Sequence, residues 1–220
     1  MALKTMKKLV QSEVAIAAGR HTLQGILSLP AGSTAVVAFA HGSGSGRFSP
    51  RNQFVAGCLQ NAGIGTLLLD LLEEHEEDDR DKVFDIELLA GRLQSAADWL
   101  RRHPDTRASR LGYFGASTGA AAALVAAARE PREIAAVVSR GGRPDMAGDY
   151  LPQVQAPTLL IVGGNDDVVI SLNEQALALL LCPKEMVVIP GATHLFPEPG
   201  ALEEVARLAS KWFGRYLVAT

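Results

Sequence analysis

The chain has 220 residues and a mass of 23.3 kDa, which suits one domain over residues 1–220, since a single core grows comfortably to about 250 residues. Its 48% hydrophobic content argues against a disordered chain. The formal charge of −3 and the pI near 6.0 argue against nucleic-acid binding, which needs clustered Lys and Arg. No apolar run approaches the roughly 18 residues that cross a bilayer, so we expect no membrane partner.

The N-terminus does not have the pattern of a secretory leader. Residues 1–10 are basic, but Gln11, Ser12 and Glu13 interrupt what would be its apolar stretch. We therefore expect a cytoplasmic protein. The two cysteines, Cys58 and Cys182, are too few for a disulfide framework, and we interpret both as structural thiols.

Strands and helices are predicted to alternate along the chain. Alternating polarity on both sides of Gly19-Arg20 predicts an antiparallel hairpin, and short apolar runs predict strands buried on both faces. The expected strands span 13–18, 21–29, 34–40, 65–71, 111–114, 134–139, 158–162 and 186–189. The expected helices span 52–61, 83–102, 118–129, 173–181 and about 202–216.

This alternation predicts an α/β fold. The clearest helix is 83–102, where Ile86, Leu89 and Leu93 begin one buried stripe at helical spacing. Strands that alternate with helices imply crossover connections, and therefore a largely parallel sheet covered on both faces. Ligands bind at the carboxyl ends of the strands in such sheets, and each motif described below follows a predicted strand.

The segment Gly115-Ala116-Ser117-Thr118-Gly119 lies between a predicted strand and an alanine-rich helix. A sharp strand-to-helix turn of this G-x-S-x-G pattern raises the serine hydroxyl above the sheet, with glycines that let strand and helix approach. The alternative is a small-residue turn in which Ser117 only caps the helix. The context favours Ser117 as a nucleophile.

A serine nucleophile needs a base, and the base needs an acid to orient it. On this kind of fold the order along the chain is Ser, then Asp or Glu, then His. His194 is the only histidine after Ser117, and it follows the strand 186–189. Two adjacent acids, Asp166 and Asp167, follow the strand 158–162.

The loop that begins at His41-Gly42-Ser43-Gly44 directly follows the strand 34–40. In hydrolases of this design, one oxyanion donor is the N–H after the nucleophile, here that of Thr118, and the other comes from this loop. Ser43 is the candidate for the second donor. The rival interpretation is a loop that binds phosphate. The sequence of this loop, however, matches neither the G-x-G-x-x-G motif nor the Gly-Lys-Ser/Thr ending of a P-loop.

Together the segments HGSGSG, GASTG, LLIVGGNDDVV and PGATHLF resemble the dienelactone hydrolase branch of the α/β-hydrolases, over about residues 14–217. The resemblance implies an eight-stranded, mostly parallel sheet. It also implies a triad of Ser117, Asp166 and His194, with an oxyanion hole from Ser43 and Thr118. The namesake enzyme of the family uses cysteine where Ser117 stands here, so the resemblance leaves the substrate open.

Other residues bear on the substrate. Only about 18 residues separate the strands 134–139 and 158–162, which leaves no room for a lid domain. Arg140 follows a strand end, where its guanidinium would suit a substrate carboxylate, and the alternative is a salt bridge or solvent exposure. Arg47 and Arg51 have the same ambiguity. The acidic segment 73–81 is interpreted as a solvated loop, since carboxylates alone are poor evidence for a metal site.

The sequence therefore predicts a serine hydrolase that cleaves a small carboxylic ester or related acyl compound. The same triad would also serve an acyltransferase or a perhydrolase, and the fold could instead be a non-catalytic scaffold that binds a small molecule. The mechanism requires no cofactor and no metal. The sequence does not indicate the oligomeric state.

Overall fold

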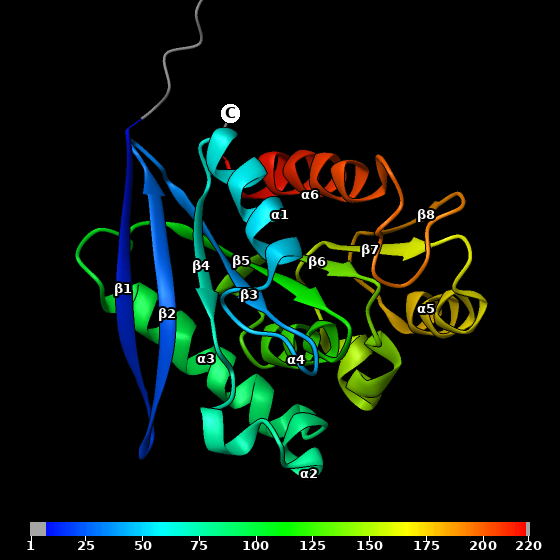
Figure 1. Ribbon diagram of the computed structural model, residues 1–220, viewed down its shortest axis with the longest axis horizontal. Helices are drawn as coiled ribbons and strands as arrows, with labels where there is room; N and C mark the ends of the chain where they lie inside the picture. Colours follow the sequence, from blue (N-terminus) through cyan, green and yellow to red (C-terminus); the bar gives the residue numbers. More distant parts are fainter. Residues whose placement is uncertain (1–7, 219–220) are drawn as a thin grey trace, which may run out of the picture.

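The computed structural model describes residues 8–218; residues 1–7, which hold most of the basic N-terminal segment, lie outside the described residues. Eight strands form one sheet in the order β1-β2-β4-β3-β5-β6-β7-β8 (Figure 1). The strands are β1 (Leu9–Ala18), β2 (His21–Pro30), β3 (Ala35–Ala40), β4 (Gly65–Leu69), β5 (Arg110–Ala116), β6 (Ile134–Arg140), β7 (Thr158–Gly163) and β8 (Lys184–Ile189). The predicted α/β fold and eight-stranded sheet are thereby confirmed.

The sheet is mostly parallel. Strands β4, β3, β5, β6, β7 and β8 pair in parallel along the sheet, whereas β2 pairs antiparallel with both β1 and β4. The predicted opening hairpin is the β1–β2 pair, which turns at Gly19, where φ is +62°. All six residues of β3 and all six of β7 are buried, as expected of strands covered on both faces.

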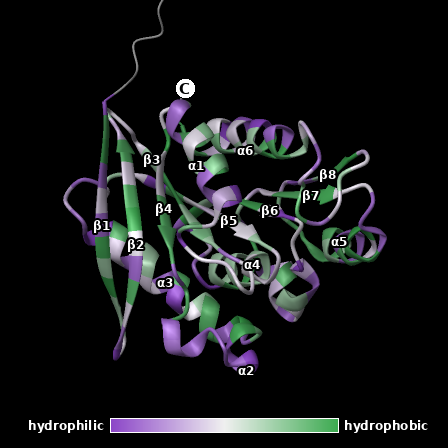
Figure 2. Cartoon of the chain, viewed as in Figure 1, coloured by the Kyte–Doolittle hydropathy of each residue, from purple (hydrophilic) through white to green (hydrophobic). Residues whose placement is uncertain are grey.

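Helices cover both faces of the sheet. The α-helices are α1 (Pro50–Asn61), α2 (Arg80–Val83), α3 (Ile86–Arg102), α4 (Thr118–Arg129), α5 (Asp167–Leu179) and α6 (Ala201–Leu217), with 3₁₀ segments η1 (Glu74–Glu76) and η2 (Pro144–Gln153). Helices α1 and α6 lie on one side of the sheet, and α3, α4 and α5 lie on the other (Figure 1). Each side has its own apolar core. Helix α6 shows the mixed colouring of an amphipathic helix (Figure 2).

The helix boundaries differ from the predicted ones where a cap decides them. The predicted helix 83–102 begins only at Ile86, because the side chain of Asp85 accepts a hydrogen bond from the Leu88 N–H. Helix α1 begins at Pro50, earlier than predicted, after the cap residue Ser49. Helix α5 begins at Asp167, directly after the turn that follows β7, and not at the predicted residue 173.

No helix in residues 8–218 is both long enough and apolar enough to cross a membrane. The cysteines are free; Cys182 is buried, and Cys58 is only partly buried.

Candidate active site

Ser117 occupies the sharp turn between β5 and α4. Its backbone has φ 51° and ψ −123°, and among residues 8–218 only Ser117 and Phe196 combine a side chain with a positive φ. Such a conformation costs about 1–3 kcal/mol and persists only where the surroundings hold it. Here the Ser117 N–H donates to the carbonyl of Arg140 (3.3 Å), and the Ser117 carbonyl accepts from the N–H of Arg143 (3.0 Å).

Two glycines of the predicted motif let the turn form. A Cβ at Gly115 would lie 2.6 Å from the carbonyl oxygen of Gly119. A Cβ at Gly119 would collide with the carbonyl of Ala40 and lie 2.5 Å from that of His41. Helix α4 therefore begins in direct backbone contact with the end of β3, which places Ser117 beside the loop that follows β3.

His194 and Asp166 are joined by a hydrogen bond of 2.7 Å between His194 Nδ1 and Asp166 Oδ2. The structure thus pairs His194 with Asp166, while Asp167 is the first residue of α5. The loops that carry the two residues are tied together, because the Asn165 N–H donates to the carbonyl of Ala192 (2.9 Å). This bond fixes the imidazole so that Nε2 is free to accept a proton.

The imidazole lies over the strand end that neighbours Ser117. A Cβ at Gly141 would lie 3.6 Å from His194 Nδ1, and Gly141 follows Arg140, whose carbonyl accepts the Ser117 N–H. Gly141 has φ +49°, a conformation that glycine adopts without cost. The Ser117 hydroxyl and His194 are not hydrogen-bonded to each other in this structure, and such bonds often tighten only when substrate binds.

The loop after β3 packs directly against Ser117. A Cβ at Gly42 would lie 2.8 Å from Ser117 Cβ and 3.6 Å from its Oγ, so only a glycine fits at this position. The predicted oxyanion residues Ser43 and Thr118 line the same small hollow. The N–H of Thr118 is at the start of α4, where helix N–H groups have no partner within the helix.

His41 holds this loop in place, a role that the sequence did not indicate. Its ring is buried, with Nε2 accepting from the Leu71 N–H (2.8 Å) and Nδ1 donating to the carbonyl of Gly42 (2.9 Å). Because the carbonyl of Gly42 and the N–H of Ser43 belong to one planar peptide, this bond also fixes where that N–H points. Burial lowers the pKa of His41, which keeps the ring neutral and able to accept from Leu71.

Asp70, directly after β4, anchors the next part of the loop. Its carboxylate accepts from the N–H of Arg47 (2.6 Å) and forms an ion pair with the Arg47 guanidinium. An open cleft of about 900 Å³ adjoins this anchor, lined by Ser45, Phe48 and Arg51 among others. Gly44 and Ser45 line both this cleft and the hollow that contains Ser43 and Thr118, so the two spaces are neighbours.

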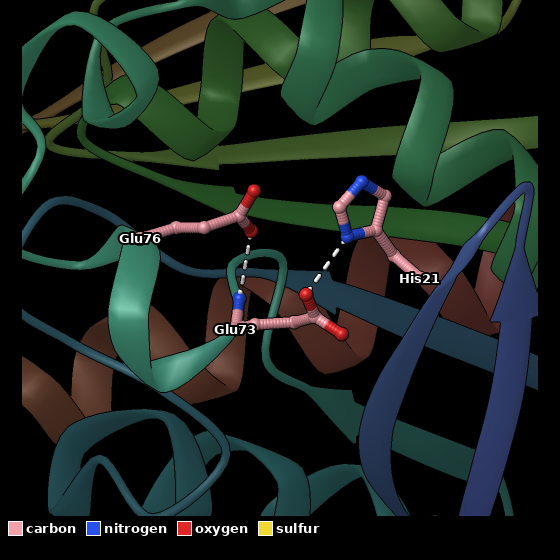
Figure 3. A group of neighbouring side chains, drawn as sticks. All are labelled: His21, Glu73 and Glu76. Carbon is pink, nitrogen blue, oxygen red and sulfur yellow. Dashed lines mark hydrogen bonds and ion pairs between the residues drawn. The ribbon is translucent and has the colours of Figure 1, made fainter.

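The acidic segment 73–81 is not simply the solvated loop that was predicted. Glu76 is 1% exposed and binds the guanidinium of Arg92 (2.5 and 2.9 Å) and Lys82 Nζ (3.1 Å). The Arg92 hydrogen bonds hold the pKa of Glu76 far below its usual range. Glu73 accepts a hydrogen bond from His21 Nδ1 (2.8 Å), and its N–H donates to Glu76; both bonds are drawn in Figure 3.

His21, Glu73 and Glu76 bring potential metal-ligand atoms within 4.8 Å of one another. Their oxygens already accept from two side-chain cations, Arg92 and Lys82, and from backbone N–H groups. This cluster is therefore arranged as an ion-pair network that fixes the segment to β2 and α3, and it does not fit a metal ion.

Arg140 lies at the carboxyl end of β6 and is buried, with 6% of its surface exposed. No side chain or carbonyl of residues 8–218 accepts a hydrogen bond from its Nε. Burial and the like charge of Arg51 lower its pKa to about 10, so the guanidinium remains charged at neutral pH. Among residues 8–218 Arg140 forms no salt bridge, and the residue as a whole is buried.

Comparisons with known proteins agree with this architecture. The pattern of the dienelactone hydrolase family matches residues 72–217. A crystal structure of dienelactone hydrolase from Anabaena variabilis is 57% identical, with a TM-score of 0.92 over 95% of this chain and 99% of that one. Est1E from Butyrivibrio proteoclasticus, solved with ferulic acid, shares the fold at 16% identity, with a TM-score of 0.80 over 92% of this chain and 98% of that one.

A Mycobacterium tuberculosis protein named "Putative phosphoribosyl transferase" is 57% identical over 201 residues. The match covers 91% of this chain but only 45% of that protein, so the chain spans less than half the length of this relative. The family match covers well over half of the chain. The chain belongs to the dienelactone hydrolase family of α/β-hydrolases.

Proposed function

We propose that the protein is a serine hydrolase that cleaves a small carboxylic ester or related acyl substrate. Ser117 acts as the nucleophile, His194 as the base, and Asp166 orients the imidazole. The N–H groups of Ser43 and Thr118 stabilise the oxyanion. The observation that carries this proposal is the 2.7 Å bond between His194 and Asp166, together with the positive φ of Ser117 in the turn between β5 and α4.

In the proposed reaction, Ser117 Oγ attacks the carbonyl carbon of the ester as His194 Nε2 takes its proton. The carbonyl oxygen becomes an oxyanion that accepts hydrogen bonds from Ser43 and Thr118. The ester C–O bond then breaks, and His194 gives its proton to the departing alcohol. A water molecule attacks the acyl-serine by the same route in reverse, which releases the acid and restores Ser117.

The surroundings of the candidate site support a substrate of modest size. An open cleft of about 900 Å³ borders the loop after β3, although Ser117 itself does not line it, and η2 is the only element between β6 and β7. A soluble ester of modest size fits such a site. The chemistry needs no cofactor, because the three side chains and two N–H groups supply every proton transfer and charge interaction.

The relative with the phosphoribosyl transferase name does not change this assignment. We infer that the activity in that name belongs to the part of the relative that this chain does not match, because a serine nucleophile with a paired His and Asp is the machinery of acyl chemistry. Acyl transfer to an acceptor other than water uses the same groups. Analysis of products formed with added alcohols or peroxide distinguishes transfer from hydrolysis.

A fluorophosphonate probe tests the proposal, because it reacts only with an activated serine. We expect stoichiometric labelling located at Ser117 by peptide mass spectrometry, and loss of labelling in Ser117→Ala and in His194→Ala. Ser171→Ala, an exposed serine on α5, is the matched control and should label normally. A folded wild-type protein that does not label would overturn the proposed function in favour of a non-catalytic scaffold.

A further inference from the structure

The small hollow that contains Ser43 and Thr118 is also lined by apolar side chains that the proposed reaction leaves unused. These are Leu72, Val83 and Leu89, which are between 3% and 9% exposed. They come from the loop after β4, from α2 and from α3. An apolar hollow beside two oxyanion donors suits an apolar part of the substrate that lies next to the reacting carbonyl group.

The geometry of the proposed reaction decides which part of the substrate lies here. The tetrahedral carbon formed by the attack carries four groups: Ser117 Oγ, the oxyanion, the alcohol oxygen and the acyl carbon. The oxyanion points to the N–H groups of Ser43 and Thr118, and the alcohol oxygen faces His194, which gives it a proton. His194 does not line the hollow, whereas Gly42 does, and a Cβ at Gly42 would lie 3.6 Å from Ser117 Oγ. The acyl group is therefore the part that enters the hollow.

The volume of the hollow limits the length of that acyl group. Its free volume is about 10 Å³, close to the space that one water-sized group needs. The methyl of an acetyl group is near this size, whereas a butanoyl group carries two further carbons. Carbons inserted into a space this tight force the neighbouring side chains out of their preferred rotamers.

Buried polar contacts hold the apolar walls together. The Leu71 N–H donates to His41 Nε2 (2.8 Å), and the Leu71 carbonyl accepts from Arg92 Nη1 (2.8 Å). Arg92 of α3 and Lys82 of α2 both bind the carboxylate of Glu76, so the two helices are tied to the same segment. The walls can separate only if this buried ion pair breaks, and breaking such a pair is strongly unfavourable. The hollow is therefore held at its small size.

We propose that the small hollow is the acyl-binding subsite and that it accepts a group no larger than the methyl of an acetyl ester. This inference rests on the proposed hydrolase function and names its substrate class, the esters of acetic acid. Glu77, an exposed residue, also lines the hollow, and its carboxylate repels an acyl group that carries a negative charge.

The first test varies the acyl group at a constant alcohol, with nitrophenyl acetate and nitrophenyl butanoate. We expect the wild type to have a kcat/KM for the acetate at least about tenfold above that for the butanoate. Val83→Ala removes two methyl groups from the wall, which matches the two added carbons, and should raise kcat/KM for butanoate relative to acetate by about tenfold. Val205→Ala, a buried valine in the core on the other face of the sheet, is the matched control and should leave this ratio unchanged.

A second variant and a second pair of substrates make the test specific. Leu89→Ala opens the same hollow from α3 and serves as the test if Val83→Ala does not fold. Nitrophenyl acetate and naphthyl acetate differ only in their alcohol, so the ratio of their kcat/KM values should be the same in the wild type and in Val83→Ala. A change in this second ratio would place Val83 on the alcohol side and overturn the assignment of the hollow to the acyl group.

The results separate the subsite from the hydrolase function. A wild type that cleaves butanoate as well as acetate would overturn the subsite, and so would a ratio that neither Val83→Ala nor Leu89→Ala changes. Fluorophosphonate labelling of Ser117 without turnover of the acetate would also overturn the subsite, while the activated serine would stand. Absent labelling together with absent turnover of both esters would overturn the hydrolase function, and the subsite with it.

Discussion

Replacing Gly119 by alanine tests how the active site is built. In most helices this change stabilises a protein, because alanine is favoured over glycine by about 1 kcal/mol. In α4 the added Cβ would collide with the carbonyl of Ala40 and lie 2.5 Å from that of His41. Both are backbone atoms at the end of a buried strand, so no side-chain rotation relieves the clash.

The expected magnitude follows from these two opposing effects. Overpacking costs about 1–3 kcal/mol, which exceeds the helix gain when the obstructing atoms are backbone. A net loss of up to about 2 kcal/mol corresponds to a Tm lower by up to about 8 °C in a chain of this size. The matched control is Gly91→Ala in α3, where a Cβ would meet nothing within 4 Å, and this variant should gain stability.

Catalysis should respond more strongly than stability. The clash pushes the end of β3 away from α4 and displaces the N–H of Ser43 relative to that of Thr118. Loss of one oxyanion donor lowers turnover by about 10²- to 10³-fold in a comparable enzyme, so we expect a decrease of at least about tenfold in kcat. The assays are thermal unfolding and ester hydrolysis. A Gly119→Ala protein as stable as Gly91→Ala, with full activity, would refute the reasoning.

Three further predictions concern ionisable side chains. Asp166→Asn should lower kcat by about 10⁴-fold, as in a comparable triad, while Asp167→Asn retains activity; equal effects in an ester assay would contradict the assignment of the acid. Glu76→Gln should lose about 3–5 kcal/mol in urea unfolding, because Arg92 is left buried and unpaired. Since burial lowers the pKa of His41 in the folded state, its contribution to stability is present above the unfolded pKa of about 6.5 and is lost as pH falls from there through the lower folded pKa. Urea unfolding at about pH 7.5 and 5.5 should show this loss in the wild type and a smaller one in His41→Ala.

The fold could be predicted because its signals are local. Six buried residues in β3 or β7 appear in the sequence as continuous apolar runs, and the stripe in α3 has the period of a helix. Boundaries were less predictable, because a single hydrogen bond decides them. Asp85 caps α3, and α5 begins at Asp167 within a run of β-branched residues that resembles a strand.

The candidate site was predicted in part. The G-x-S-x-G spelling and the order of Ser117, Asp166 and His194 are properties of the sequence, so the sequence is sufficient to name the candidates. The choice between Asp166 and Asp167 could not be made from the residues alone, because two adjacent carboxylates have the same chemistry. The hydrogen bond to His194 distinguishes them, and it depends on how the two loops are tied together at Asn165.

What the sequence by itself determined is the alternation of strands and helices and the small residues at the Ser117 turn, because both depend on neighbours along the chain. What only the tertiary structure decided is which charges have partners. Glu76 lies in a run of acidic residues that indicates a solvated loop, yet it is buried and paired with Arg92. Arg140 is also buried, but no carboxylate among the described residues pairs with it. Pairing of charges depends on segments far apart in the chain, so no local pattern can reveal it.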